Sequence, residues 1–504
     1  MTPPLSQRRL RVEHPININE SLEELLTSGG DHRLRRLPET GLSKYRVAPH
    51  ARDSVPLGSC TASSPSPSSL GSAERLLAEL RRAPVLSTAA PAIYGTQRER
   101  LRALFEVENE VEIALLPSGT DAVYLVSEVA LRFSERVHHV VVGASELGGG
   151  TVNAAKGLSV SDVAPHADAK MGAPIEGLAE RCSAEPVYLR DAKGTRIEVD
   201  AVDEDVAEKV RRAARDTHVV LHMVAHSKTG LCSPSARLCR ELQSELGDRL
   251  TVLLDAAQGR LAPRDIRNAL SMGFVALFTG SKFYGGPPFS CALLFPPGRA
   301  ADPGPLSRGL SDWFSRADLP AGWSRAKESL REPYNLGLLL RWEAALHEIE
   351  RYHSLRPRDR AGAYHTFSGA VHEVFGPSEI IELDVPRPPT HELLTALGAY
   401  PTVFGFRVHG ENGPLKATAL QKLHTLLDTD LADSGLPPGT WHLGQPVPLG
   451  PPTEDRAALL RVALGARLVS EHAETPDAAG GFFRNTLRGV RAKLEAIVAA
   501  GMVE

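Results

Sequence analysis

The sequence predicts that Asp255 and Lys282 are buried and chemically reactive. Asp255 directly follows apolar residues in LTVLLDAAQ, and Lys282 follows the apolar run FVALF among small residues that let a ligand approach the backbone. Burial lowers the pKa of a lysine and makes its amine nucleophilic, whereas a buried carboxylate requires a cation or a donor. A structural ion pair for Asp255 and a solvated charge for Lys282 are the alternatives for each residue taken alone.

A polar turn elsewhere in the chain has the composition of an anion site. Ser118, Gly119 and Thr120 in LLPSGTDA lie between a short apolar run and an amphipathic run. A turn that opens a helix presents backbone N–H groups and hydroxyls at the positive end of the helix dipole, which suits a phosphate. Ordinary helix capping is the alternative reading. Gln258, shortly after Asp255, adds an amide that can donate to a phenolate oxygen.

Taken together, these groups match the requirements of one cofactor, pyridoxal 5′-phosphate (PLP). PLP needs an anchor for its phosphate, a carboxylate that keeps its pyridine nitrogen protonated, and an amine that forms a Schiff base. An anion cradle, Asp255 and Lys282 supply these three functions. Their joint occurrence by chance is far less probable than that of each alone, so the sequence predicts a PLP site.

The elements that must position these residues are those of an α/β domain. Short apolar or β-branched runs alternate with helical patterns such as SARLCRELQSEL, and they occupy residues 137–144, 218–226, 250–258, 274–282 and 291–298. Strands that are apolar throughout and separated by helices are typical of a mostly parallel sheet with helices on both faces. Ligands bind such sheets at the carboxyl ends of the strands, where Asp255 and Lys282 stand.

Three regions are expected along the chain. Residues 1–70 are polar and rich in Pro and Ser, and they predict an N-terminal arm. Residues 71–335 hold the alternating pattern and predict the large, PLP-binding domain. Residues 336–504 begin with the helical pattern NLGLLLRWEAALHEIERYH, which we interpret as a connecting helix, and continue as a smaller α+β domain.

Composition narrows the class of protein further. The 504 residues carry a formal charge of −4, so no net positive field exists to hold nucleic acid or an anionic membrane surface. No stretch approaches the ~20 apolar residues of a membrane span. The cysteines predict neither a disulfide framework nor a zinc site, and they favour a reducing compartment; they are Cys60, Cys182, Cys232, Cys239 and Cys291. We expect a soluble, cytoplasmic protein without a metal ion.

The stretch DAAQGRLAPRDIRNALSMGFVALFTGSKFYGGPPFSCALLF carries a family resemblance. It resembles the corresponding stretch of fold-type I PLP enzymes, nearest to the branch of class V aminotransferases and cysteine desulfurases, and the similarity extends from about Tyr94 to Arg467. The resemblance implies that Asp255 pairs with the pyridinium nitrogen and that Gln258 faces the phenolic oxygen. It also implies that Lys282 forms the internal aldimine.

The same resemblance extends to other binding residues. Thr279 and Ser281 match two positions that help to hold phosphate, although relatives often have histidine where Ser281 stands. The loop AHSKTG resembles a segment that approaches the ring, which implies a contribution from His226 or Ser227, with an ordinary turn as the alternative. Arg461 in LLRVALGARLV matches an arginine that binds the substrate carboxylate, for which a guanidinium fork is well suited. The resemblance also implies a homodimer.

Two departures from the family bear on the reaction. No cysteine follows Cys291, although cysteine desulfurases need one on a loop between the lysine and the arginine, so desulfuration is disfavoured. GASELGGGT stands where relatives usually place a ring over the cofactor, which leaves space for a bulky substrate or a second cosubstrate. The resemblance implies that an amino acid reacts through an external aldimine and a quinonoid. We expect a lyase, a β- or γ-replacement or a carbon–carbon bond-forming enzyme of secondary metabolism.

Other functions remain open at this stage. A class V-type aminotransferase is the main alternative, because it shares every step up to the quinonoid. A PLP-binding transcription regulator would need a basic DNA reader, which a Pro/Ser-rich arm does not supply. A nicotinamide-dependent enzyme is a third alternative, but the glycines of GASELGGG do not fit the G-x-G-x-x-G pattern.

Overall fold

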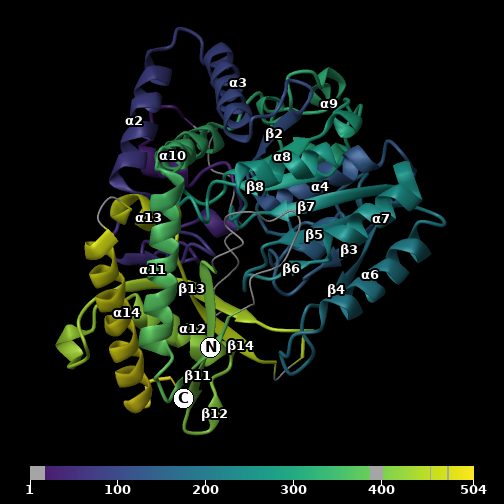
Figure 1. Ribbon diagram of the computed structural model, residues 1–504. Helices are drawn as coiled ribbons and strands as arrows, with labels where there is room; N and C mark the ends of the chain where they lie inside the picture. Colours follow the sequence, from purple (N-terminus) through teal and green to yellow (C-terminus); the bar gives the residue numbers. More distant parts are fainter. Residues whose placement is uncertain (1–16, 386–400, 454–455, 474–475, 504) are drawn as a thin grey trace, which may run out of the picture.

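The computed structural model describes residues 17–385, 401–453, 456–473 and 476–503, whose strands form two sheets (Figure 1). The larger sheet has the order β2-β9-β8-β7-β5-β3-β4, with β6 paired to β5. Its strands are β2 (Glu112–Leu116), β3 (Val137–Val142), β4 (Cys182–Val187), β5 (His218–Ala225), β6 (Cys232–Ser233), β7 (Leu250–Ala256), β8 (Val275–Thr279) and β9 (Cys291–Phe295).

The larger sheet is mostly parallel, as predicted. Strands β4, β3, β5, β7 and β8 pair in parallel, whereas β9 is antiparallel to both β8 and β2. Every residue of β5, β7 and β8 is buried. Because successive side chains of a strand point to opposite faces, both faces of this sheet are covered. The apolar runs identified in the sequence therefore became the strands of the sheet core.

Helices from between the strands provide this cover. α4 (Gly119–Ala130) packs against β2, β5, β8 and β9, while α6 (Val199–Ala213), α7 (Ala236–Leu246) and α8 (Pro263–Ser271) pack against β3, β5, β7 and β8. The short helices α5 (Thr151–Ala155) and α9 (Ser324–Glu328) lie in the connections. The mixed α/β architecture expected from the sequence is confirmed.

The smaller sheet has the order β1-β13-β14-β11-β10, with β12 paired to β11. Its strands are β1 (Val55–Leu57), β10 (Ile381–Asp384), β11 (Val403–Gly410), β12 (Gly413–Pro414), β13 (Trp441–Pro448) and β14 (Ala458–Ala463). α12 (Ala417–Leu427) packs on β13 and β14, and α14 (Pro476–Ala499) packs on α11 (Pro357–Phe375).

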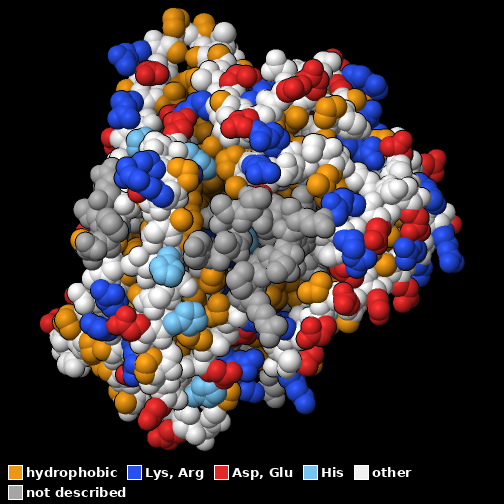
Figure 2. Space-filling model, viewed as in Figure 1, with side chains coloured by type: hydrophobic (Ala, Val, Ile, Leu, Met, Phe, Trp, Pro, Cys, Tyr) orange, Lys and Arg blue, Asp and Glu red, His pale blue; other side chains and the backbone are white. Residues whose placement is uncertain are grey.

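Long helices run beside and between the sheets. α10 (Leu336–His353) is the helix expected from NLGLLLRWEAALHEIERYH, and α11 follows it toward the smaller sheet (Figure 1). α10 packs against α2 (Pro67–Arg82), α3 (Leu86–Phe105) and α13 (Ala466–His472). The expected domain boundaries near residues 70 and 335 stay a prediction. No described helix is long and apolar enough to cross a membrane, and Figure 2 shows acidic and basic side chains interspersed on one face.

Part of the predicted N-terminal arm, within the described residues 17–62, contains regular secondary structure. This N-terminal segment, residues 17–62, contains α1 (Leu22–Leu26) and β1, and β1 pairs in parallel with β13 of the smaller sheet. Its sequence has no sustained apolar periodicity, although Leu25, Leu26 and Leu57 are buried in the main hydrophobic core.

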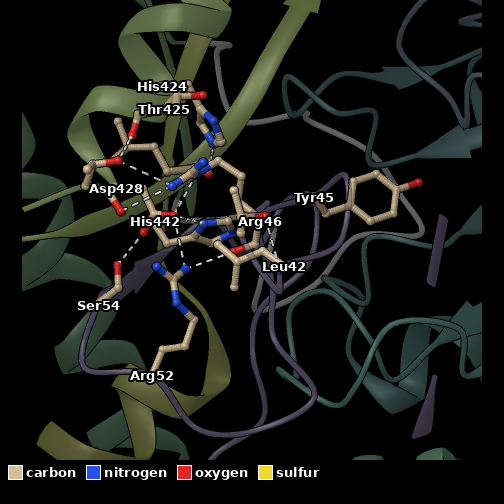
Figure 3. A network of polar contacts seen from close by, with 12 residues as sticks. Leu42, Tyr45, Arg46, Arg52, Ser54, His424, Thr425, Asp428 and His442 are labelled. Atoms are coloured by element: carbon tan, nitrogen blue, oxygen red, sulfur yellow. Dashed lines mark hydrogen bonds and ion pairs between the residues drawn. The ribbon is translucent and has the colours of Figure 1, made fainter. Parts of the chain in front are cut away.

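Buried Asp428, at the end of α12, is the main polar anchor of this segment (Figure 3). Its carboxylate accepts hydrogen bonds from Arg46 Nε at 2.9 Å, Arg52 Nη1 at 3.0 Å and Ser54 Oγ at 2.8 Å. Burial alone would raise the pKa of Asp428, but the neighbouring His442 and Arg52 outweigh it and hold the pKa below its usual range. The carboxylate therefore stays charged at neutral pH.

Substitution of Asp428 tests this anchor. Asp428→Asn leaves Arg46 and Arg52 without a counter-charge, and we expect a loss of about 3 kcal/mol in the free energy of unfolding. Limited proteolysis and hydrogen exchange should show the opening within residues 42–57. Glu23→Gln, which removes only exposed ion pairs, should cost at most about 1 kcal/mol. Equal protection in Asp428→Asn and the parent protein would contradict the anchoring role.

The same anchor has a defined pH dependence. Folding depresses the pKa of Asp428. The contribution of Asp428 to the free energy of unfolding is therefore complete above its unfolded-state pKa of about 3.9, and it is lost as the pH falls through the folded-state pKa.

Candidate active site

Strand register brings the predicted catalytic and phosphate-binding segments to one edge of the larger sheet. Leu116, the last residue of β2, pairs with Cys291 at the start of β9, and Cys291 pairs with Thr279, the last residue of β8. β7 lies beside β8 in parallel, so Asp255 near its end belongs to the same edge. The segments that follow these strands must therefore meet there.

A cavity of about 420 Å³ lies at this edge and contains most of the predicted site. Its volume is within the roughly 300–1,000 Å³ usual for small-molecule and cofactor sites. The predicted residues that line it are Ser118, Gly119, Thr120, Asp255, Thr279, Ser281, Lys282 and Arg461. Residues from β2, β7, β8 and β14 thus converge as the sequence predicted, although their chemical roles stay predictions.

Lys282 and Asp255 influence each other within the cavity. Burial lowers the pKa of Lys282, and the charge of Asp255 opposes this shift. Burial raises the pKa of Asp255, against the charge of Lys282 and a hydrogen bond from the Ala257 N–H at 3.0 Å. The amine is therefore easier to deprotonate than an exposed lysine, which favours nucleophilic and acid–base chemistry.

The turn after β2, where the sequence predicts an anion site, opens helix α4. Ser118 is the N-cap of α4, and its Oγ accepts from the Asp121 N–H at 3.2 Å. A Cβ atom on Gly148 would lie 3.0 Å from Thr120 Oγ1, so this glycine leaves the threonine hydroxyl its space. Thr279 is less available, because its hydroxyl donates to the Ala257 carbonyl at 2.6 Å.

Three predicted residues are buried but do not line the cavity: Gln258, His226 and Ser227. The Gln258 amide donates to the carbonyl of Cys60 at 3.1 Å. The Ser227 hydroxyl donates to Glu146 Oε2 at 2.7 Å. In this arrangement Gln258 and Ser227 support neighbouring loops.

Glu146 organises the loop on which the sequence expected an open ring face. It is fully buried and forms an ion pair of 3.0 Å with Arg190, which also pairs with Asp384 at 2.7 Å. Glu146 additionally accepts hydrogen bonds from the hydroxyls of Ser227 and Thr229. These contacts occupy both oxygens of the Glu146 carboxylate. The neighbouring glycines 148–150 line the cavity.

Arg461 lines the cavity, but both of its Nη groups already donate hydrogen bonds to protein acceptors. Its Nη1 donates to the Lys228 carbonyl at 3.1 Å, and its Nη2 donates to Thr61 Oγ1 at 3.0 Å and to the Gln445 carbonyl. Among the described residues, Arg461 Nε has no hydrogen-bond partner, so part of the guanidinium remains available to a substrate carboxylate.

Lys228 is a further cation of the cavity, beside Arg461, that the sequence did not identify. Burial first, and then the charges of Arg461 and Lys282, lower its pKa to about 7, with Glu146 and Cys60 opposing. The two cations Lys228 and Arg461 together suit one carboxylate. AHSKTG contained this lysine, but no spacing marked it as different from a surface charge.

The N-terminal segment supplies further cavity residues that the sequence reading missed. They are His32, Arg33, Lys44, Tyr45, Cys60, Thr61 and Ala62. Nothing in the local sequence pattern identifies them, because their position depends on contacts with both sheets. Cys60 places a thiol in the cavity from outside the loop on which desulfurases carry theirs.

Comparison with solved structures identifies the fold. The cysteine desulfurase CsdA from Escherichia coli is 14% identical with a TM-score of 0.51, covering 86% of this chain and 95% of that one. The pyridoxamine-pyruvate aminotransferase from Mesorhizobium loti is 14% identical with a TM-score of 0.50, covering 89% and 98%. A cystine C-S lyase is 12% identical with a TM-score of 0.52, covering 86% and 97%.

These similarities define the class of fold. The chain has the fold of the class V, fold-type I PLP enzymes, which confirms the predicted fold. No protein-family model and no curated protein sequence matches it. At such low identities the comparison establishes the fold, and the reaction must be argued from the site.

The role of Lys228 can be tested by anion binding. In the parent protein, affinity for a small carboxylate such as a 2-oxo acid should fall as the pH rises through about 7, because Lys228 loses its proton. Lys228→Met should weaken binding roughly 10-fold at low pH and remove this pH dependence. Titration calorimetry between about pH 6 and pH 9 measures both effects.

Lys156→Met, a change at an exposed lysine, is the matched control and should leave binding unchanged. Retention of the full pH dependence in Lys228→Met would exclude Lys228 from the anion site.

Proposed function

We propose that this protein is a PLP-dependent enzyme that acts on an amino acid. The observation that carries the proposal is the convergence of Lys282 and Asp255 in one cavity with the Ser118–Thr120 turn. The residues present fit the cofactor: an amine with a lowered pKa, a buried carboxylate with few protein partners, and hydroxyls at a helix N-terminus. PLP, when bound, supplies an electron sink for a bond to the substrate Cα.

The roles of the protein groups follow from their positions. Lys282 would hold the cofactor covalently and, when released by the substrate, move protons at the substrate Cα. Asp255 would hold a proton on the cofactor ring nitrogen, for which a buried carboxylate is well suited. The turn at Ser118 would hold the phosphate, with Thr279 and Ser281 nearby. Lys228 and Arg461 would orient the substrate carboxylate.

For the reaction, we favour a lyase, a β- or γ-replacement or a carbon–carbon bond-forming enzyme of secondary metabolism. The glycines at 148–150 line the cavity and leave room for a bulky substrate or a second cosubstrate. Transamination is the second candidate, since an aminotransferase and a C-S lyase both share this fold. A homodimer in the cytoplasm, without a nucleic-acid or membrane partner, completes the proposal.

Reductive trapping tests the cofactor assignment. After incubation with PLP and borohydride, peptide mass spectrometry should find the pyridoxyl group on Lys282. Lys282→Ala should remove this label and the visible absorbance, because the charge of Lys282 acts on Asp255 more strongly than that of Lys228, the other cavity lysine that influences this carboxylate. Lys156→Ala is the surface control and should keep the label. A label elsewhere in the parent protein, or none, would refute the proposed function.

The reaction class can be separated by product analysis. The purified protein is incubated with a panel of amino acids, with and without a 2-oxo acid acceptor. We expect products of elimination, replacement or condensation that do not require the acceptor. Stoichiometric amino transfer to the acceptor would instead establish the aminotransferase. Sulfide release from cysteine, compared between the parent protein and Cys60→Ala, tests whether the thiol in the cavity takes part.

A further inference from the structure

Arg33 of the N-terminal segment reaches into the turn that is proposed to hold the cofactor phosphate. Its Nη2 lies 3.2 Å from Ser118 Oγ, and its Nη1 lies 3.5 Å from Thr120 Oγ1. The side chain lines the cavity together with both hydroxyls. Arg33 therefore lies at the N-terminus of α4, although the two are at least 85 residues apart in the sequence.

The other edge and one face of the guanidinium are fixed by neighbouring side chains. Arg33 Nε donates to both carboxylate oxygens of buried Asp31, at 2.9 and 2.8 Å, and Arg33 Nη2 forms an ion pair of 2.6 Å with Asp31 Oδ2. The Phe289 ring lies against the guanidinium, with 4.7 Å between Cζ and the ring centroid. The Asp31 pair therefore orients the guanidinium so that Nη1 faces Thr120, while Nη2 is shared between Asp31 and Ser118.

The turn that precedes Arg33 is itself anchored to α10. Arg341 donates from Nη1 to the Leu26 carbonyl and from Nη2 to the Gly29 carbonyl, each at 3.1 Å. Asn335 Nδ2 donates to the same Gly29 carbonyl at 2.8 Å. Because Arg341 and Asn335 are fully buried, the backbone that presents Arg33 has little freedom, and the anion site is preorganised.

We propose that Arg33 is a phosphate-binding residue of the cofactor site, supplied by the chain's own N-terminal segment. This inference rests on the proposed function, which places the phosphate at Ser118–Thr120. A guanidinium fork can donate two parallel hydrogen bonds to phosphate oxygens, and hydroxyls beside it can rotate to donate as well. The site thereby selects the phosphorylated cofactor over its unphosphorylated form.

The charges around the turn are compatible with a phosphate dianion. The charge of Asp31 keeps the pKa of Arg33 above its ordinary value despite burial, so the guanidinium stays charged. Burial raises the pKa of Asp121 to about 7, with Arg33 opposing, so this neighbouring carboxyl binds a proton more readily than an exposed one. The charged Arg33 would attract a phosphate, its pair with Asp31 offsets the charge of that carboxylate, and protonation of Asp121 would reduce the remaining repulsion.

The test compares two forms of the cofactor in Arg33 variants. PLP and pyridoxal, which lacks the phosphate, are each titrated into the full-length apoprotein, and binding is followed by absorbance. Arg33→Gln should weaken PLP binding about 10- to 100-fold, the range of a lost charged hydrogen bond. Its affinity for pyridoxal should change by less than about threefold, and Arg33→Lys should be intermediate for PLP.

Arg36→Gln is the matched control, because Arg36 lies in the same segment and makes an exposed ion pair with Glu23. It should bind both forms as the parent protein does. If Arg33→Gln weakens PLP and pyridoxal equally, or weakens neither, the inference is overturned while the proposed function stands. If the parent protein itself does not bind PLP at Lys282, the proposed function fails and the inference fails with it.

Discussion

Burial lowers the pKa of Lys282 and raises the pKa of Asp255, and the chemistry of the site depends on these opposite shifts. Removal of water favours the neutral amine and the neutral carboxyl, whereas their mutual attraction favours both charges. Neither group is stable as an isolated buried ion, so the fold must bring them to the same edge of the sheet. The pairing of β7 with β8 does this, since the two strands run in parallel and end together.

The second constraint concerns the N-terminal segment, which lines part of the cavity and docks through buried charges as well as through a few buried apolar side chains. Residues 17–62 are held by buried charges at both ends, with Asp428 on one side and Arg341 on the other. A buried carboxylate or guanidinium is destabilising without its partners, so these contacts specify one docked position better than a loose apolar contact would. The polar composition of the segment is therefore compatible with an ordered structure.

The sequence allowed prediction of what depends on local pattern and on strand ends. The apolar runs predicted β3, β5, β7, β8 and β9, and the strand-end rule predicted that residues such as Asp255, Lys282 and Ser118 meet in one cavity. The position of Arg33 could not be predicted, because it results from contacts across the whole large domain. Resemblance implied that Gln258, and His226 or Ser227, lie near the cofactor ring, but it could not show that Gln258 donates to the Cys60 carbonyl and Ser227 to Glu146.

Cations of the cavity fall into two groups, and the N-terminal segment contributes to both. Arg33 faces the hydroxyls of Ser118 and Thr120, while Thr61 accepts from Arg461 next to Lys228. An anion bound at either place would therefore interact with a side chain fixed by the docked segment or with the segment itself. Ligands that bind only the docked state must stabilise docking by their own binding free energy. If anions bind at these two places as proposed, docking of the N-terminal segment and anion binding are one coupled equilibrium.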